Sequence, residues 1–157
     1  MYPTRVLLEN LFETVPQLSC LDIELIYNDS ISIAFDFEFI CEKFSCLRRL
    51  ELDVRKQTLA DNSVRIDRLE HLEELKIRNA KSISFIHRNN VRCLTIMFRV
   101  LRKRDLDEIP KKFPRLNRLT INCGYSVFAS CFIRLHKLMP SCRIDYDSHR
   151  FYPQVYP

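Results

Sequence analysis

Histidine and cysteine, the residue types that most often perform chemistry in proteins, are scattered along this chain. Cys131 and His136 form the nearest Cys–His pair, but they are five residues apart and would not share a helix face well, and no second pair is spaced to complete a zinc site. The single glycine, Gly124, excludes the glycine-rich loops that hold phosphate. We therefore expect no catalytic residue, no metal and no cofactor, and we predict that the protein is not an enzyme. The other histidines are His71, His87 and His149.

The seven cysteines are typical of reduced thiols that pack as small apolar side chains. Their number is odd, and no two of them form a CxxC pair. Residues 1–15 lack the features of a secretory signal, and no apolar run approaches the roughly 18 residues of a membrane span. We expect a cytoplasmic or nuclear protein with no membrane contact. The cysteines are Cys20, Cys41, Cys46, Cys93, Cys123, Cys131 and Cys142.

Charge divides the chain into two halves of opposite sign. Residues 1–78 carry a formal net charge of −5, and residues 79–157 carry +10. A basic patch of this kind attracts acidic partners or nucleic acid. No aromatic residues for base stacking are interleaved with it, which argues against nucleic acid as the partner. The alternative is an ordinary solvated helix face and loop. The patch comprises Arg102, Lys103, Arg104, Lys111 and Lys112, and the same positive end includes Arg99, Arg115 and Arg118.

A repeated leucine pattern must position these side chains. Successive copies of LxxLxL, with Ile allowed at the last position, begin 29, 25, 19, 25 and 23 residues apart. The spacing predicts short strands that turn two alternate side chains into a core, joined by returning segments. The copies are Leu18-Leu21-Ile23, Leu47-Leu50-Leu52, Leu72-Leu75-Ile77, Val91-Leu94-Ile96 and Leu116-Leu119-Ile121, with a degenerate sixth at Met139-Cys142-Ile144.

Helical spacing between the copies predicts the returning segments. Val6, Leu7, Leu11 and Val15 fit one helix face ended by Pro16, and residues 106–113 form a shorter stripe ended by Pro114. Residues 127–138 repeat the arrangement, while residues 64–71 predict only a turn or a short helix. Residues 31–40 fit both periods, and we expect an extended start at 31–34 followed by a helix from about residue 36.

The order of helix, proline and LxxLxL, as in Pro16-Gln17-Leu18 and Pro114-Arg115-Leu116, resembles the leucine-rich repeat proteins, most closely the repeat region of F-box proteins. The resemblance implies an α/β solenoid over residues 1–148, with five to six irregular repeats. Its curved parallel sheet of short strands would form the concave face, with helices and irregular turns on the convex face. Residues 149–157 would form a tail. No F-box segment is visible, so we expect a fragment or a shortened relative.

Two further features follow from this comparison. The family usually places Asn or Cys three residues after the last strand leucine, whereas this chain has Ile26, Arg55, Ala80, Arg99 and Gly124 there. We therefore expect irregular turns. The resemblance also implies a second function, that of the substrate-recognition subunit of an SCF-type ubiquitin ligase, whose partner would be the ligase adaptor if an F-box exists.

The positions between the leucines face outward and would line the concave surface, which solenoids use for binding. Arginines on such a surface can form bidentate contacts with carboxylates. We predict a non-enzymatic module that binds an unidentified protein partner there; a nucleic-acid or acidic-partner binder using the basic half is the third alternative. The same register turns Asp22, Glu24 and Asp53 outward. The predicted contact residues are Arg48, Arg49, Glu51, Glu73, Glu74, Lys76, Arg78, Arg92, Thr95, Met97, Arg118 and Asn122.

Overall fold

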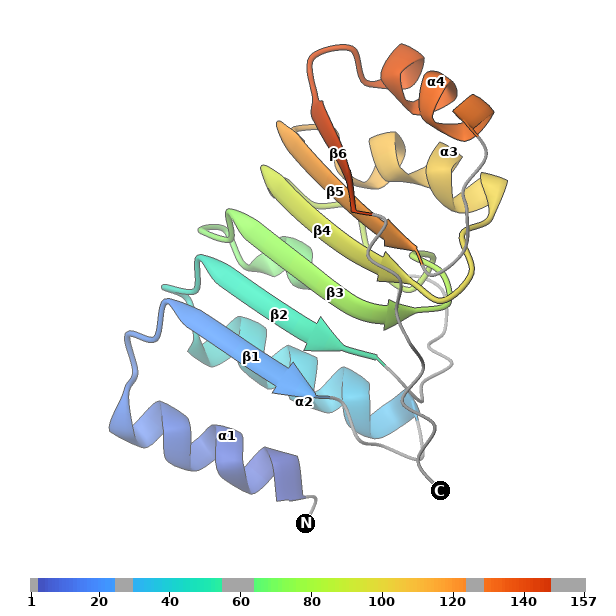
Figure 1. Ribbon diagram of the computed structural model, residues 1–157. Coiled ribbons are helices and arrows are strands. Elements are labelled where there is room, and N and C mark those ends of the chain that lie inside the picture. Colours follow the sequence, from blue (N-terminus) through green and yellow to red (C-terminus); the bar gives the residue numbers. More distant parts are fainter. Residues whose placement is uncertain (1–2, 25–29, 55–63, 124–128, 148–157) are drawn as a thin grey trace, which may run out of the picture.

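Strands and helices alternate along the chain except that β4 follows β3 directly, which gives an α/β fold (Figure 1). The computed structural model describes residues 3–24, 30–54, 64–123 and 129–147. The predicted tail at 149–157 and the turn positions Ile26, Arg55 and Gly124 lie outside this part of the chain. The elements are α1 (Pro3–Thr14), β1 (Cys20–Glu24), α2 (Ser30–Lys43), β2 (Arg49–Asp53), the 3-10 helix η1 (Ile66–Arg68), β3 (Glu74–Ala80), β4 (Cys93–Phe98), α3 (Lys103–Lys112), β5 (Arg118–Cys123), α4 (Ala129–Leu138) and β6 (Arg143–Asp147).

The six strands form one parallel sheet in the order of the sequence, from β1 to β6. The second pattern position of each copy lies beside that of the next copy, and the same holds for the third position. The structure confirms the predicted register of the first five copies, and both rows are buried. The rows are Leu21, Leu50, Leu75, Leu94 and Leu119, and Ile23, Leu52, Ile77, Ile96 and Ile121.

The register predicted for the sixth copy is wrong. Ile144 pairs with Leu119, and Tyr146 pairs with Ile121, so the strand leucine positions fall at residues 144 and 146. The Cys142 amide donates to the Met139 carbonyl at 3.1 Å, in the same way that the first leucine of other copies bonds three residues back. Cys142 therefore begins the sixth copy, which is one residue shorter than LxxLxL, and Met139 belongs to the preceding turn.

Proline ends three of the helices at the same point of the repeat. Helices α1, α3 and α4 stop two residues before Pro16, Pro114 and Pro140, respectively. A residue that precedes proline is sterically disfavoured in helical conformation, so each helix must end before it. This confirms the predicted order of helix, proline and strand. Helix α3 also contains Pro110, which interrupts its backbone hydrogen bonding but does not end it.

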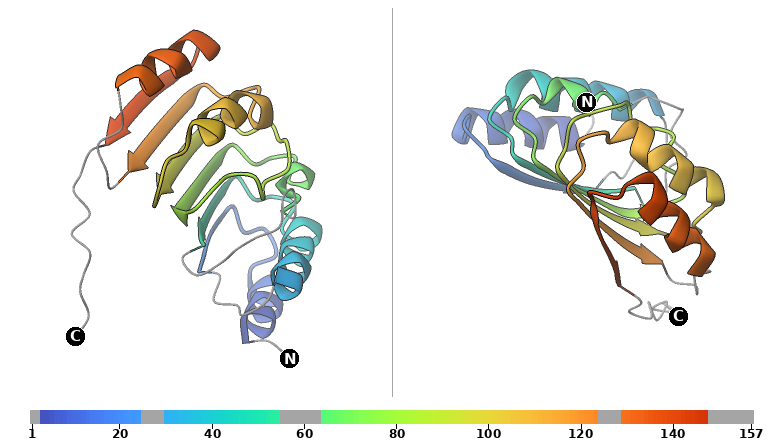
Figure 2. Two further views of the ribbon diagram at one scale, coloured as in Figure 1. Left: turned by 90° about the vertical axis from the view of Figure 1, so that its right-hand side faces the viewer. Right: turned by 90° about the horizontal axis from the view of Figure 1, so that it is seen from above.

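All the helices lie on one side of the sheet (Figure 2). The other side carries no described helix, and we call it the open face. Between the helices and the sheet lies one apolar core, which includes Phe37, Phe44 and Phe113. Phe12 of α1 meets Phe39 and Phe44 of α2 edge-on, with ring centroids 6.4 and 5.8 Å apart. In the described segments, no helix has the length and apolar character that would let it cross a bilayer.

Helix α2 begins at Ser30, so the extended start predicted at residues 31–34 is wrong. Apolar residues occupy most positions of this segment and therefore satisfy a strand period and a helix period at once. The packing of its second half decides between them. Phe37, Ile40, Cys41 and Phe44 are all buried and recur at helical spacing, which places one face of the helix against the core.

The face that α1 buries also differs from the predicted one. Leu8 is buried, and Leu11 packs against the core, whereas Leu7 is 67% exposed and Val15 is 41% exposed. The predicted helix is confirmed, but its apolar stripe is rotated by about one residue. The short helix expected within residues 64–71 is present as η1, at Ile66–Arg68.

Candidate protein-binding surface

The twelve side chains predicted to contact a partner lie on the strands of the open face or immediately before those strands. Along β1–β5 the leucine and isoleucine positions are buried, and the residues between them are exposed or half-buried. Arg48, Glu73 and Arg92 directly precede β2, β3 and β4. The parallel register therefore brings side chains from separate repeats into adjacent positions. The nine residues on the strands have the outward parity that the alternation predicts, whereas Arg48, Glu73 and Arg92 have the parity of the buried leucines and lie at the edge of the sheet where the strands begin.

Charged side chains at the start of β2 and β3 pair across the sheet. Arg48 Nη1 lies 3.7 Å from Glu73 Oε1, and Arg49 Nε lies 3.3 Å from Glu74 Oε2. Both members of each pair are exposed by 40% or more. Such pairs contribute little to stability because water and salt screen them. The two pairs nevertheless engage Arg48 and Arg49, which the sequence predicts to be contact residues.

A more buried cluster lies further along the same strands. Glu51 Oε1 is 2.9 Å from Lys76 Nζ and 3.0 Å from Arg78 Nε, although the Arg78 Nε–H does not point at an acceptor. Arg78 Nη2 reaches past β2 and donates to Asp22 Oδ1 on β1 at 3.0 Å. The Glu51 side chain is 16% exposed. This cluster ties three strands together, so its members are engaged with one another.

The strand register predicts that Asp53 faces outward. This prediction is wrong, because the Asp53 side chain is buried, with 1% of its surface exposed. Asn79 Nδ2 donates to its Oδ1 at 2.8 Å, and Arg78 Nε lies 3.9 Å from Oδ2. Asn79 has φ of 61°, in the left-handed region that asparagine tolerates, where the register between β3 and β4 shifts. Asn79, at the irregular end of β3, therefore bonds to the carboxylate, which is buried.

The second half of the open face has a different pattern of charge. Arg92 and Arg118 are exposed, and neither makes an ion pair or side-chain hydrogen bond to any residue that the structure describes. The amides of Asn117 and Arg118 donate to the Arg92 carbonyl, which holds the two arginines on neighbouring strands. Thr95 and Met97 on β4 and Asn122 on β5 are half-buried and uncharged. On β6, Arg143 pairs with Asp145 at 3.1 Å.

The predicted basic patch lies on the helix side of the sheet, apart from the open face (Figure 1). Arg102, Lys103 and Arg104 are exposed at the start of α3, and Lys111 is exposed near its end. Lys112 does not belong to a free patch. Its ammonium group donates to the carbonyl of Ser84 at 3.0 Å and to the carbonyl of Ile86, so it holds the loop before β4.

Asp105 is a buried carboxylate that the sequence analysis missed. It is 0% exposed, accepts a hydrogen bond from Ser82 Oγ at 2.9 Å, and accepts another from the Arg102 amide at 3.3 Å. It stands in the first turn of α3, where a negative charge is favourable. An acidic residue three positions into a helix is the sequence signal for such a cap. Its role is to join the loop after β3 to the helix.

Burial changes the pKa of groups away from the open face. It raises the pKa of the Cys41 thiol to about 11 and that of the Tyr146 hydroxyl to about 12. It also raises the pKa of the Cys142 thiol. These shifts keep the thiols protonated and therefore poorly nucleophilic. Across the described ranges, no group of three or more His, Cys, Asp or Glu side chains is placed to hold a metal ion.

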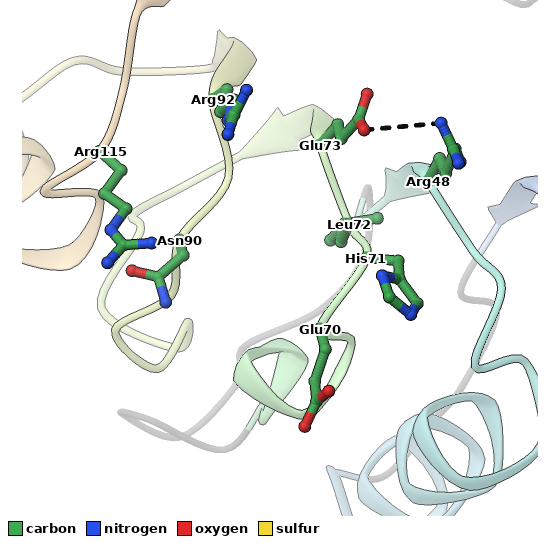
Figure 3. Close-up of a pocket in the computed structure, with 8 residues that line it drawn as sticks. All are labelled: Arg48, Glu70, His71, Leu72, Glu73, Asn90, Arg92 and Arg115. Carbon is green, nitrogen blue, oxygen red and sulfur yellow. Dashed lines mark ion pairs between the residues drawn. The ribbon is translucent and has the colours of Figure 1, made fainter.

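A hollow of about 250 Å³ opens at the edge of the sheet where β3, β4 and β5 begin (Figure 3). Its charged lining includes the Arg48–Glu73 pair, Arg92 and Arg115. Asn90 and His71 come from the loops before β4 and β3. The LxxLxL register locates the strand positions but not the loops beside them, so the sequence analysis missed the hollow.

No protein-family model, curated protein or solved structure matches this chain. The feature that distinguishes the surface is the contrast between the paired charges over β1–β3 and Arg92 and Arg118, which make no ion pair with a residue that the structure describes.

Proposed function

We propose that this chain is a non-enzymatic solenoid of the leucine-rich repeat type that binds a protein partner on its open face. Three features support the solenoid: strands in sequential order, leucines aligned in rows across the sheet, and helices on one side only. In solenoids the sheet surface left uncovered is the one that meets ligands. The open face corresponds to the concave face expected from the sequence.

The observation that carries the proposal is the unpaired state of Arg92 and Arg118 within the described residues. A guanidinium offers five donors in a planar fork that matches a carboxylate, and arginine is enriched among the residues that dominate binding energy. Arginines already paired with a neighbour must break that pair to bind. Arg92 and Arg118 can engage a partner without that loss, and the half-buried Thr95 and Met97 lie next to them on β4.

The test is affinity capture of the tagged chain from its own cell type, compared across matched variants. We expect the double variant Arg92→Glu and Arg118→Glu to lose partners that the parent retains, because both anchors reverse their charge. Lys103→Glu with Arg104→Glu makes the same change of charge on α3 and serves as the control. Thermal melting of each variant shows that it is folded. Identical partners in all three samples would refute binding on the open face.

The same capture separates the two other functions. A ubiquitin-ligase adaptor and cullin retained by both double variants would support a substrate-recognition subunit, the function that the F-box resemblance implies. Nucleic-acid binding through the basic patch predicts affinity for RNA or DNA that falls steeply with salt. No binding at about 50 mM salt would remove that alternative. The engagement of Lys112 with two loop carbonyls leaves that patch with one fewer available cation.

A further inference from the structure

The hollow at the start of β3, β4 and β5 has donor groups on one side that no other described residue engages. Arg92 and Arg115 make no ion pair with a residue of the described segments, whereas Arg48 is paired with Glu73. Figure 3 shows the Arg115 guanidinium beside the Asn90 amide, facing His71 and Leu72 across the hollow. Two guanidinium groups and one amide thus border a space large enough for a side chain.

The charge of the lining selects the kind of group that fits. Three arginines and two glutamates line the hollow, so the net formal charge is +1 when histidine is counted as neutral. One carboxylate would neutralise this charge. A dianion would leave an excess of negative charge, with Glu70 and Glu73 beside it, and like charges at short range are unfavourable. The lining therefore favours a monoanion over a phosphate group.

We propose that this hollow binds a single carboxylate of a protein partner, held by Arg92 and Arg115 with the Asn90 amide as a further donor. The source of the carboxylate rests on the proposed function, since a bound protein would supply it from an aspartate or glutamate side chain or from its C-terminus. The hollow opens where Arg92 begins the open face, so a partner lying on β4 could place an acidic residue in it. Arg92 would then serve both surfaces.

The experiment uses small probes, so it does not depend on finding the partner. The folded chain is titrated with N-acetyl-glutamate amide while the side-chain Nε–Hε signals of Arg92 and Arg115 are followed by NMR. N-acetyl-glutamine amide is the neutral match, and N-acetyl-phosphoserine amide supplies a dianion at about pH 7.5. N-acetylglycine carries the carboxylate of a chain terminus and separates the two protein sources. We expect saturable shifts with glutamate, and weaker or no shifts with glutamine and phosphoserine.

Two double variants test whether the glutamate probe binds in the hollow. Arg92→Gln with Arg115→Gln should raise the dissociation constant of the glutamate probe about tenfold, a loss of about 1.4 kcal/mol. Lys103→Gln with Arg104→Gln removes the same charge from α3 and should leave the constant unchanged. The proposal is overturned if the glutamate probe gives no saturable shift, if phosphoserine binds more tightly, or if both double variants behave alike. Partner capture on the open face with no probe binding would overturn this proposal alone. Probe binding without any partner would overturn the proposed function instead.

Discussion

Across the open face, β1–β3 carry charged side chains that contact one another, whereas β4 and β5 begin with arginines that contact no described acidic side chain. The two regions use the same strand positions and the same parallel register. Around Arg118 they differ in the sign of the neighbouring residues, whereas Arg92 lies beside Glu73 but makes no ion pair with it in the part of the chain that the structure describes. In the first region each basic residue lies beside an acidic residue of the adjacent strand, and in the second, Arg118 lies between Cys93 and Arg143.

A charged residue that faces outward is not for that reason alone a contact residue. Lys76 and Arg78 face outward as predicted, yet Glu51 lies about 3 Å from both. To bind a partner they would have to give up these ion pairs, and the partner would have to compensate for that loss. Arg92 and Arg118 of the second region have no ion pair with a described residue that a partner would have to replace. We therefore propose that a partner contacts the second region, while the charges of the first region are engaged with one another.

The largest loss of stability is expected for substitutions in the apolar core, which the two regions share. Leu50 and Leu119 are 0% exposed and stand in the same row, one in each region. We expect Leu50→Ala or Leu119→Ala to lower the free energy of unfolding by about 2–5 kcal/mol, because each leaves a cavity. Urea denaturation measures the change, and Thr120→Ala on the open face is the control. If either leucine variant is as stable as the parent, the core register is wrong.

A smaller effect should distinguish the charges of the two regions. Glu51→Gln weakens two ion pairs of a side chain that is 16% exposed, so we expect a loss of about 1–2 kcal/mol in the free energy of unfolding. Arg92→Gln removes a charge with no described partner and should change stability by less than about 0.5 kcal/mol. Urea midpoints of the two variants give the comparison. If the two variants lose the same free energy of unfolding, the charges of the first region are no more engaged in stabilising contacts than those of the second.

The features predicted correctly from the sequence are those set by a short-range rule. LxxLxL fixes which residues turn inward, and parallel pairing of like copies then fixes the rows of Leu50 and Leu119. Proline fixes the ends of α1, α3 and α4 for an equally local reason. The register predicted for the sixth copy is wrong because none of its three pattern residues, Met139, Cys142 and Ile144, is a leucine that would fix the alignment. Helix α2 was misplaced in part because its apolar residues satisfy two periods.

The features that could not be predicted depend on contacts between residues distant in sequence. Asp53 is buried because Asn79, 26 residues later, folds back on it. Lys112 is lost from the basic patch because it meets carbonyls 26 and 28 residues earlier. The hollow needs three loops from three repeats. In each case the residue type is visible in the sequence, but its partner is set by how the repeats stack.

The smallest change in stability is expected for the Arg65–Asp67 ion pair, which lies outside the open face. Because its two residues are close in sequence, it can be compared with the ion pairs that join separate strands. Arg65 donates from Nε and Nη2 to the two carboxylate oxygens of Asp67, each at 3.0 Å, and these hydrogen bonds hold the pKa of Asp67 below its ordinary value of 3.8. The Coulomb interaction with His87, whose Nδ1 lies 3.5 Å from Asp67 Oδ1, lowers the pKa of Asp67 further. A lowered pKa in the folded state stabilises the protein above the ordinary value, and this contribution is lost as the pH falls through the folded-state value.

The parent should therefore lose a little more stability than Asp67→Asn between about pH 6 and about pH 3, as measured by urea midpoints. NMR titration of the Asp67 carboxyl gives the cause directly, since Arg65→Gln should return its pKa toward the ordinary value. Because the two residues are only two positions apart, their pairing needs no stacking of repeats and should survive in a variant such as Leu119→Ala. The pairs between β2 and β3 require the sheet. If the pKa of Asp67 rises in Leu119→Ala, the Arg65–Asp67 pair depends on the whole fold, and the distinction between local and cross-strand charges fails.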